Sequence, residues 1–149
     1  MLADALVAYG HFLSIFFTLS CLVAEAALYR RELSATTLAW LRRIDLGYLV
    51  GAIAIIATGV ARVVHFGKGA AFYQDNPIFW VKMALFVAVG LASVPPTLHY
   101  IRTAKRLQAG EIVIDDAVYR RIRFYLTGQL VLFACIPLAA TLMARGIGL

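Results

Sequence analysis

The sequence predicts an all-α fold, an integral membrane four-helix transmembrane bundle with antiparallel helices. Hydrophobic residues make up 62% of the 149 residues. They gather in four runs, and each run is close to the roughly 20 residues that a helix needs to cross a hydrocarbon core of about 30 Å. The runs are 5–29, 46–66, 78–98 and 124–144. A buried core helix of a soluble protein is the alternative, but such a helix needs others to cover it, and all four runs are apolar nearly all round. We therefore expect residues 1–149 to form a single transmembrane domain.

The first run could instead be a secretory signal peptide. However, it carries Asp4 where a signal peptide has a basic start, and it is longer than the apolar core of such a peptide. It also ends in Tyr29-Arg30-Arg31, without the small residues of a cleavage site. We therefore expect the first run to remain in the mature protein as a transmembrane helix.

The later runs show the same character. The second contains an uncharged stretch at 46–61, which a soluble amphipathic helix could not place against water. The helix of the third run is expected to continue through residues 101–107 into the cytoplasm. The segment 110–116 then forms a turn or a short interfacial segment before the fourth run.

The basic residues predict the orientation of the bundle. Four of them lie in 30–45 and six in 102–123, so these two connections hold ten of the fourteen Lys and Arg residues. Connections rich in Lys and Arg stay in the cytoplasm, which leaves both termini and the loop 67–77 outside. This asymmetry accounts for the net charge of +6. No nucleic acid partner is expected, and anionic lipid of the bilayer would help to hold the basic connections.

Polar side chains follow one stripe on each of the first three helices. Residues three or four apart lie on the same face of a helix, so such stripes are expected to face the inside of the bundle. The fourth run offers only Thr127 and Gln129, so the first three helices are expected to build the site. The stripes are His11, Ser14, Thr18, Cys21 and Glu25 on the first helix; Asp45, Tyr48, Gly51, Thr58, Gly59, Arg62 and His65 on the second; and Lys82, Phe86, Gly90, Ser93 and Thr97 on the third.

Four ionisable residues of these stripes lie near one face of the membrane. His11 is about 9 Å and Lys82 about 7 Å below the outer ends of their helices, at the helical rise of about 1.5 Å per residue. Arg62 lies at a similar depth and His65 nearer the surface. Charged residues at such depth need a partner, and Glu25 and Asp45 lie toward the inner side, so the missing partner is expected to be an anionic ligand or a metal.

Haem b fits this set of residues. His11 and His65 are the candidate iron ligands, and Arg62 and Lys82 are the candidate partners of the haem propionates. Glycines on the inward stripes would let a flat porphyrin approach the backbone; they are Gly51, Gly59 and Gly90. We expect one haem per chain at most, because the remaining histidine, His99, lies at the inner end.

Other interpretations of the same residues remain open. Arg62 and Lys82 could reach outer lipid phosphates, with His65 at the interface and His11 hydrogen-bonded to Ser14 or Tyr9. A copper or other bare-metal site formed by His11 and His65 is a further alternative, although the chain lacks the methionine and cysteine clusters that soft-metal transport uses.

Several segments resemble an uncharacterised family of small bacterial four-helix membrane proteins, known as a domain of unknown function. These segments are 2–12, 59–69 with Phe72-Tyr73, and 76–82. The resemblance covers most of the chain and implies a multi-pass protein of the bacterial inner (cytoplasmic) membrane.

A more distant similarity is to the HemJ-type protoporphyrinogen oxidases, which are haem-binding proteins with a related helical layout. That family has a histidine in its first helix and approximately Trp-Leu-His-x-Lys before the lysine of its third. Here the segment reads Phe79-Trp80-Val81-Lys82, so His11 and Lys82 have counterparts and the second family histidine does not. The similarity implies porphyrin binding, with His65 as a replacement for the missing ligand.

Two classes of function follow. The first is a b-type haem protein that transfers electrons between the quinone pool and a periplasmic redox partner, or a haem-dependent membrane oxidoreductase that acts on a small reductant there. The second is a non-redox membrane subunit or small transporter in which Arg62 and Lys82 bind an anionic solute or lipid. A homodimer is expected because a bundle of 16.3 kDa has little material with which to enclose a large cofactor. The sequence assigns no catalytic residue.

Overall fold

The computed structural model describes residues 1–66, 70–106 and 112–147. Four long helices dominate it, and each is long and apolar enough to cross a membrane. They are α1 (Leu2–Leu28), α2 (Ala35–Ala61), α4 (Pro77–Arg106) and α5 (Asp116–Ala144). A π-helical turn, η1 (Arg62–Phe66), extends α2, and a short helix, α3 (Ala70–Gln74), precedes α4. The structure therefore confirms the all-α fold with four candidate membrane spans.

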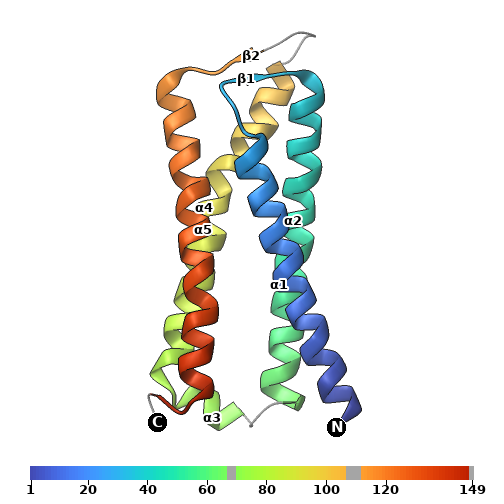
Figure 1. The fold of residues 1–149 in the computed structure, drawn as a ribbon, viewed down its shortest axis with the longest axis vertical. Coiled ribbons are helices and arrows are strands. Elements are labelled where there is room, and N and C mark those ends of the chain that lie inside the picture. The colour runs from blue at the N-terminus through green and yellow to red at the C-terminus, as the bar shows by residue number, and fades with distance from the viewer. Residues whose placement is uncertain (67–69, 107–111, 148–149) are drawn as a thin grey trace.

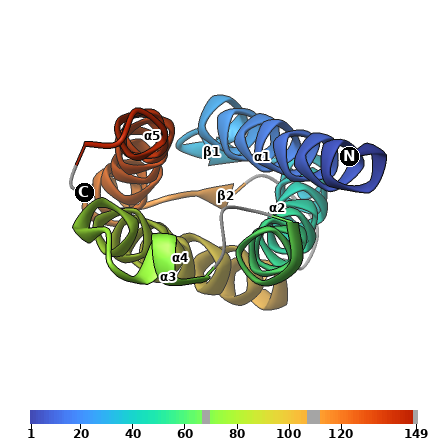
Figure 2. The ribbon, with the colours of Figure 1, turned by 90° about the horizontal axis from the view of Figure 1, so that it is seen from below.

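The long helices form two antiparallel hairpins (Figure 1). Helix α1 packs along α2, and α4 packs along α5. Viewed along the bundle, α1 leans toward α5 and α4 leans toward α2 at the end that is far from the two termini (Figure 2). We call this end the strand end, and we call the end that holds both termini the terminal end.

Two short strands join the hairpins at the strand end. Strand β1 (Glu32–Leu33) pairs antiparallel with β2 (Ile112–Val113), with Glu32 opposite Val113 and Leu33 opposite Ile112. The backbone N–H of Ile114 donates to the carbonyl of Arg31 at 2.8 Å. The sequence predicted a turn or an interfacial segment over 110–116. The structure places β2 and the start of α5 there, and residues 110–111 lie outside the described part of the chain.

Side-chain caps fix where the helices begin at the strand end. The Ser34 hydroxyl accepts from the N–H of Thr37, and the Asp115 carboxylate accepts from the N–H groups of Ala117 and Val118. Helix α2 thus begins before the second apolar run, and α5 before the fourth. The third helix continues to Arg106, as predicted, while Leu107 lies outside the described residues. An apolar run marks the part of a helix that crosses the hydrocarbon, whereas capping residues mark where the helix begins.

The most deeply buried side chains lie in the half of the bundle next to the strand end. Tyr29 from the end of α1 stacks on Tyr119 of α5 with ring centroids 5.5 Å apart, which joins the two hairpins. Eight apolar side chains of this half are at most 1% exposed, and they are Leu22, Tyr29, Leu33, Leu38, Leu41, Tyr100, Ile122 and Leu126.

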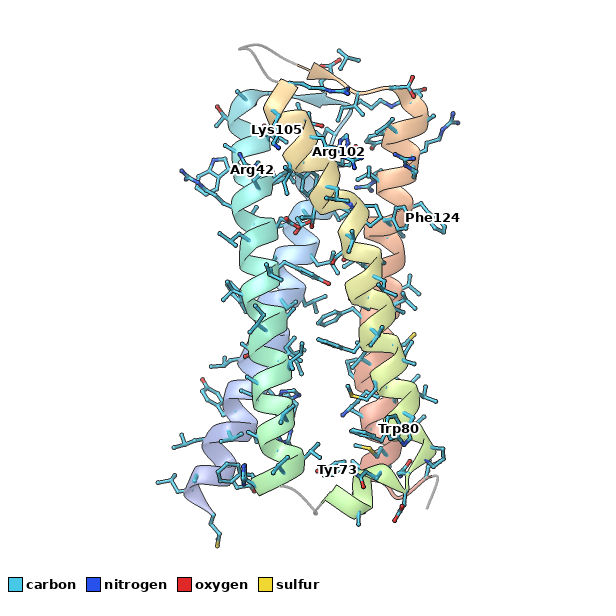
Figure 3. The ribbon with its side chains drawn as sticks, turned by 180° about the vertical axis from the view of Figure 1, so that it is seen from behind. Arg42, Tyr73, Trp80, Arg102, Lys105 and Phe124 are labelled. Carbon is cyan, nitrogen blue, oxygen red and sulfur yellow. The ribbon has the colours of Figure 1, made fainter. Side chains whose placement is uncertain are left out.

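Large apolar side chains are exposed along the rest of the bundle, as a surface that faces lipid requires. Examples are Phe16, Val60, Trp80 and Leu138. Charged side chains, including Arg42, Arg102 and Lys105, gather toward the strand end, whereas the aromatic Tyr73 and Trp80 lie toward the terminal end (Figure 3). Basic residues at one end of a bundle and aromatic residues near the other are typical of a membrane protein.

Gln129 of α5 satisfies the backbone carbonyl that Pro96 leaves free in α4. Pro96 lacks the N–H that would bond to the carbonyl of Ala92 one turn earlier. The amide Nε2 of Gln129, a buried residue on α5, donates to that carbonyl at 3.2 Å. In a bilayer a free backbone carbonyl is costly, so this contact both satisfies α4 and fixes its position against α5.

Candidate functional site at the terminal end

His11 is held by a hydrogen bond between α1 and α2. Its Nδ1 lies 2.8 Å from the hydroxyl oxygen of Thr58. That hydroxyl has one proton, which it donates to the carbonyl of Ala54 at 2.6 Å, so its oxygen accepts from His11. With the Thr58 proton on the Ala54 carbonyl, the imidazole proton lies on Nδ1 and the lone pair on Nε2. Orientation of a histidine through its second nitrogen is typical of metal-ligating imidazoles.

The hydrogen-bond partner of His11 differs from the alternative that the sequence suggested. Ser14 donates to the carbonyl of Gly10 on its own helix at 2.8 Å, so its hydroxyl proton is engaged there. Thr58, which the sequence placed only on the inward stripe of the second helix, is the residue that orients the ring. Thr58 lies one turn before Arg62, so it holds His11 close to the cations described below.

The three glycines that were expected to admit a porphyrin serve different purposes. A Cβ at Gly51 would collide with the hydroxyl of Thr18, so this glycine lets α1 approach α2 closely. A Cβ at Gly59 would lie 3.4 Å from Cε1 of His11, so this glycine gives room to the imidazole. Gly90 is exposed and faces open space, which makes the prediction of an inward position wrong for it. The stripe of α4 is turned further outward than its spacing suggested.

Arg62 and Lys82 bring positive charge to His11 from two other elements. Both are half-buried, and both act electrostatically on the imidazole, while Arg62 also acts on Lys82. The Arg62 guanidinium lies 6.0 Å from the ring centroid of Phe12, and the Lys82 ammonium lies 5.5 Å from that of Phe79. The structure thus places these three predicted site residues in one region at the terminal end.

These cations have no carboxylate within ion-pair distance among the described residues. The ion pair of that part of the chain, Arg31 with Asp116 at 2.9 Å, lies at the strand end. Moreover, Nε of Arg62 is buried and has no hydrogen-bond partner among the residues that the structure describes. A buried donor without an acceptor is costly, so this nitrogen is available to an acceptor that is not among the described residues.

His65 lies apart from the half-buried face that carries Arg62. It is exposed, and its ring meets Phe66 edge to face at 6.2 Å between centroids. The sequence assumed an α-helical stripe through Arg62 and His65, but these residues belong to the π-helical turn η1. A π-helical turn has hydrogen bonds from i to i+5, which rotates residues three apart away from a common face.

The sequence did not predict a second polar group, which lies toward the strand end. Glu25 and Tyr100 are almost fully buried and Asp45 is half-buried, and they come from α1, α4 and α2. The polar stripes of the sequence did contain two of its members: Glu25 is the last residue of the stripe on the first helix, and Asp45 is the first residue of the stripe on the second. The sequence does not show that these acids meet Tyr100 and Thr97 of α4, because those hydrogen bonds depend on how the helices pack.

Among residues 1–66, 70–106 and 112–147, no three or more His, Cys, Asp or Glu side chains are grouped so as to hold a bare metal ion. The terminal end instead offers an oriented imidazole and two cations that have no acid partner in the described part of the chain. Such a set fits a planar ligand that carries both a metal and carboxylates, as haem does.

A family model described as "Predicted membrane protein (DUF2214)" matches residues 3–148. No curated protein and no solved structure matches the chain. The match agrees with the resemblance to an uncharacterised membrane protein family, and the distant similarity to HemJ-type enzymes stays a prediction.

Proposed function

The chain belongs to the DUF2214 family of predicted membrane proteins, and on that premise we propose that it is a b-type haem protein of the bacterial inner membrane. The observation that carries the proposal is the meeting of His11, Arg62 and Lys82 at the terminal end. An imidazole with its lone pair on Nε2 and two cations without acid partners among the described residues suit an iron and two propionates.

In this proposal His11 is the iron ligand on α1 and Thr58 keeps its ring oriented. Arg62 and Lys82 hold the propionates, with the buried Nε of Arg62 as a donor. His65 is the candidate for the second axial position, which requires its exposed ring to turn toward the bundle. Bound haem would supply one-electron redox chemistry. Positive charge from Arg62 and Lys82 favours the reduced form of the site.

The proposed orientation puts the terminal end outside. The strand end carries the basic connections and faces the cytoplasm, and both termini lie in the periplasm. The site would then exchange electrons between the quinone pool and a periplasmic partner, or oxidise a small reductant at that face. One haem per chain and a homodimer complete the proposal.

The test is a spectrum of the protein purified in mild detergent from cells supplied with haem precursor. A haem protein should be red, with a Soret band that shifts on reduction with dithionite. His11→Ala should lose most of the haem, whereas the control His99→Ala, at the other end of the bundle, should keep it. Full haem content and an unchanged spectrum in His11→Ala would refute the ligand assignment.

The cations provide a second measurement. Arg62→Gln and Lys82→Gln should weaken haem retention or lower the reduction potential, because each removes positive charge that favours the reduced iron. Lys105→Gln, at the strand end, is the matched control and should behave like the parent. If both test variants bind haem normally and titrate at the parental potential, Arg62 and Lys82 have another partner.

The unpartnered Nε of Arg62 also favours a second candidate, a non-redox membrane subunit or small transporter that binds an anionic solute or lipid phosphate at Arg62 and Lys82. This protein would be colourless under all the conditions above. Co-purified anionic lipid that is lost in Arg62→Gln and kept in Lys105→Gln would support it.

A further inference from the structure

A group of five polar side chains lies inside the bundle on the side of the strand end, away from His11. Glu25 on α1 is 3% exposed, and Tyr100 on α4, which donates to its Oε2 at 3.5 Å, is 0% exposed. On α2, the half-buried Asp45 accepts from Thr97 of α4 at 2.7 Å, and Tyr48 is buried beside both carboxyls. Three helices therefore bring two carboxyl groups and three hydroxyls together inside the bundle.

One atom of this group has no partner. Oε1 of Glu25 is buried and makes no hydrogen bond to any residue that the structure describes. The two carboxyl groups act electrostatically on each other, so two negative charges here would repel. A buried, unpaired carboxylate beside a second acidic group is unfavourable, whereas a carboxylic acid is neutral and gains an O–H donor.

No described cation neutralises Glu25 directly. Arg123 of α5, the basic residue in contact with this segment of α1, donates to the backbone carbonyl of Ala26. His99 of α4 pairs with the hydroxyl of Tyr29 at 3.2 Å. The titratable and charged groups that surround Glu25 are Cys21 and Tyr29 on and just after α1, Asp45 and Tyr48 on α2, His99 and Tyr100 on α4, and Tyr119, Arg121 and Arg123 on α5.

We propose that Glu25, with Asp45 beside it, is a proton-binding site that exchanges one proton with the side of the membrane at the strand end. A proton from water adds to a carboxylate oxygen of Glu25 to form the neutral acid, and it returns to water when the acid ionises. Asp45 is half-buried and so partly open to water, whereas Glu25 is almost fully buried. The ligand is a proton because protonation makes the buried Glu25 neutral and so removes the cost of a buried charge.

This site needs no haem, so its test is independent of the proposed function. The protein is reconstituted in liposomes and treated with dicyclohexylcarbodiimide, which adds to protonated carboxyl groups in apolar surroundings and leaves ionised ones unmodified. Mass spectrometry of peptides then gives the labelled residue as a function of pH. We expect labelling at Glu25 at neutral pH, which disappears as the pH is raised.

Glu25→Gln should lose the label, and Glu32→Gln, which alters an exposed acid on β1, is the matched control that should keep it. In Asp45→Asn the label on Glu25 should be lost at a lower pH than in the parent, because the charge that disfavours ionised Glu25 is gone. If Glu25→Gln does not fold, Asp45→Asn still tests the proposal. The same labelling in His11→Ala would separate the proton site from the haem site.

Two results would overturn the proposal. The first is the absence of label on Glu25 at neutral pH in folded parent protein, because the residue would then be ionised. The second is protection of Glu25 by sodium ions at constant pH, which would make the group a metal cation site instead of a proton site.

Discussion

The two halves of the bundle satisfy their polar groups in different ways. Near the strand end the helices of both hairpins meet, β1 pairs with β2, and Gln129 and Arg123 donate to backbone carbonyls of neighbouring helices. Near the terminal end α2 ends in a π-helical turn, and the buried Nε of Arg62 has no acceptor among the described residues.

This difference indicates that one half of the bundle stabilises the fold, whereas the other half is the candidate binding region. The half near the strand end contains most of the fully buried side chains, so it holds the hairpins together. At the terminal end, Asn76 is an exception: it is fully buried, caps α4 and donates to the carbonyl of Ile147. That end also holds the buried Nε of Arg62, which has no acceptor among the described residues. Substitutions in the two halves should therefore have different consequences.

The largest expected effect concerns which half faces the cytoplasm, because the result is all or none. Reporter fusions at Thr36 and Gly110 should report the cytoplasm, and a fusion after Leu149 should report the periplasm. Gly110 and Leu149 lie outside the described residues, whereas Thr36 is in the first turn of α2. A cytoplasmic signal from the C-terminal fusion would reverse the proposed assignment of the two ends.

The next largest effect is expected for a substitution that disturbs the contact between α1 and α2, and it would be a loss of stability. Gly51→Val would drive a side chain into Thr18 and Phe17 and separate the helices. Overpacking of this kind costs about 1–3 kcal/mol or more, seen as a lower midpoint of thermal unfolding in detergent. Gly90→Val, where the structure has open space, should change the midpoint little. Equal effects at both glycines would mean that α1 and α2 are not packed as described.

The next largest effect on stability is expected for a substitution of Gln129. Gln129→Leu keeps the volume of the side chain but leaves the carbonyl of Ala92 without a donor, which costs about 1–3 kcal/mol. The control is Thr127→Leu, an exposed position on the same helix. If unfolding in detergent is unchanged in Gln129→Leu, the carbonyl finds another donor and Gln129 does not fix α4 against α5.

The smallest effect is expected at the exposed ion pair of the strand end. Asp116→Asn removes the partner of Arg31, and both side chains are more than half exposed. Such pairs contribute about 0–1 kcal/mol, and salt screens them. The unfolding midpoint of Asp116→Asn should therefore lie close to that of the parent, with the small difference disappearing at high salt. A large loss of stability would show that this end depends on charge pairing instead of on its buried apolar side chains.

Much of the fold could be predicted from the sequence because membrane insertion depends on local properties. The length and apolarity of the four runs determine the spans, and the spacing of His11, Ser14 and Thr18 correctly predicted the inward face of α1. The same reasoning failed for Gly90 and for the common stripe of Arg62 and His65. Neither the rotation of α4 in the bundle nor the π-helical turn is a property of spacing alone.

By itself the sequence determined that this protein has four membrane-spanning helices and a cluster of basic residues at one end, and that cations and histidines lie near the other end. The tertiary structure decided which of these residues meet: Thr58 with His11, Gln129 with the carbonyl freed by Pro96, and Glu25 with Tyr100. The physical reason is that hydrophobicity and helical periodicity act within one helix. The partner of a polar group across a bundle depends instead on how helices distant in sequence lean and rotate against one another.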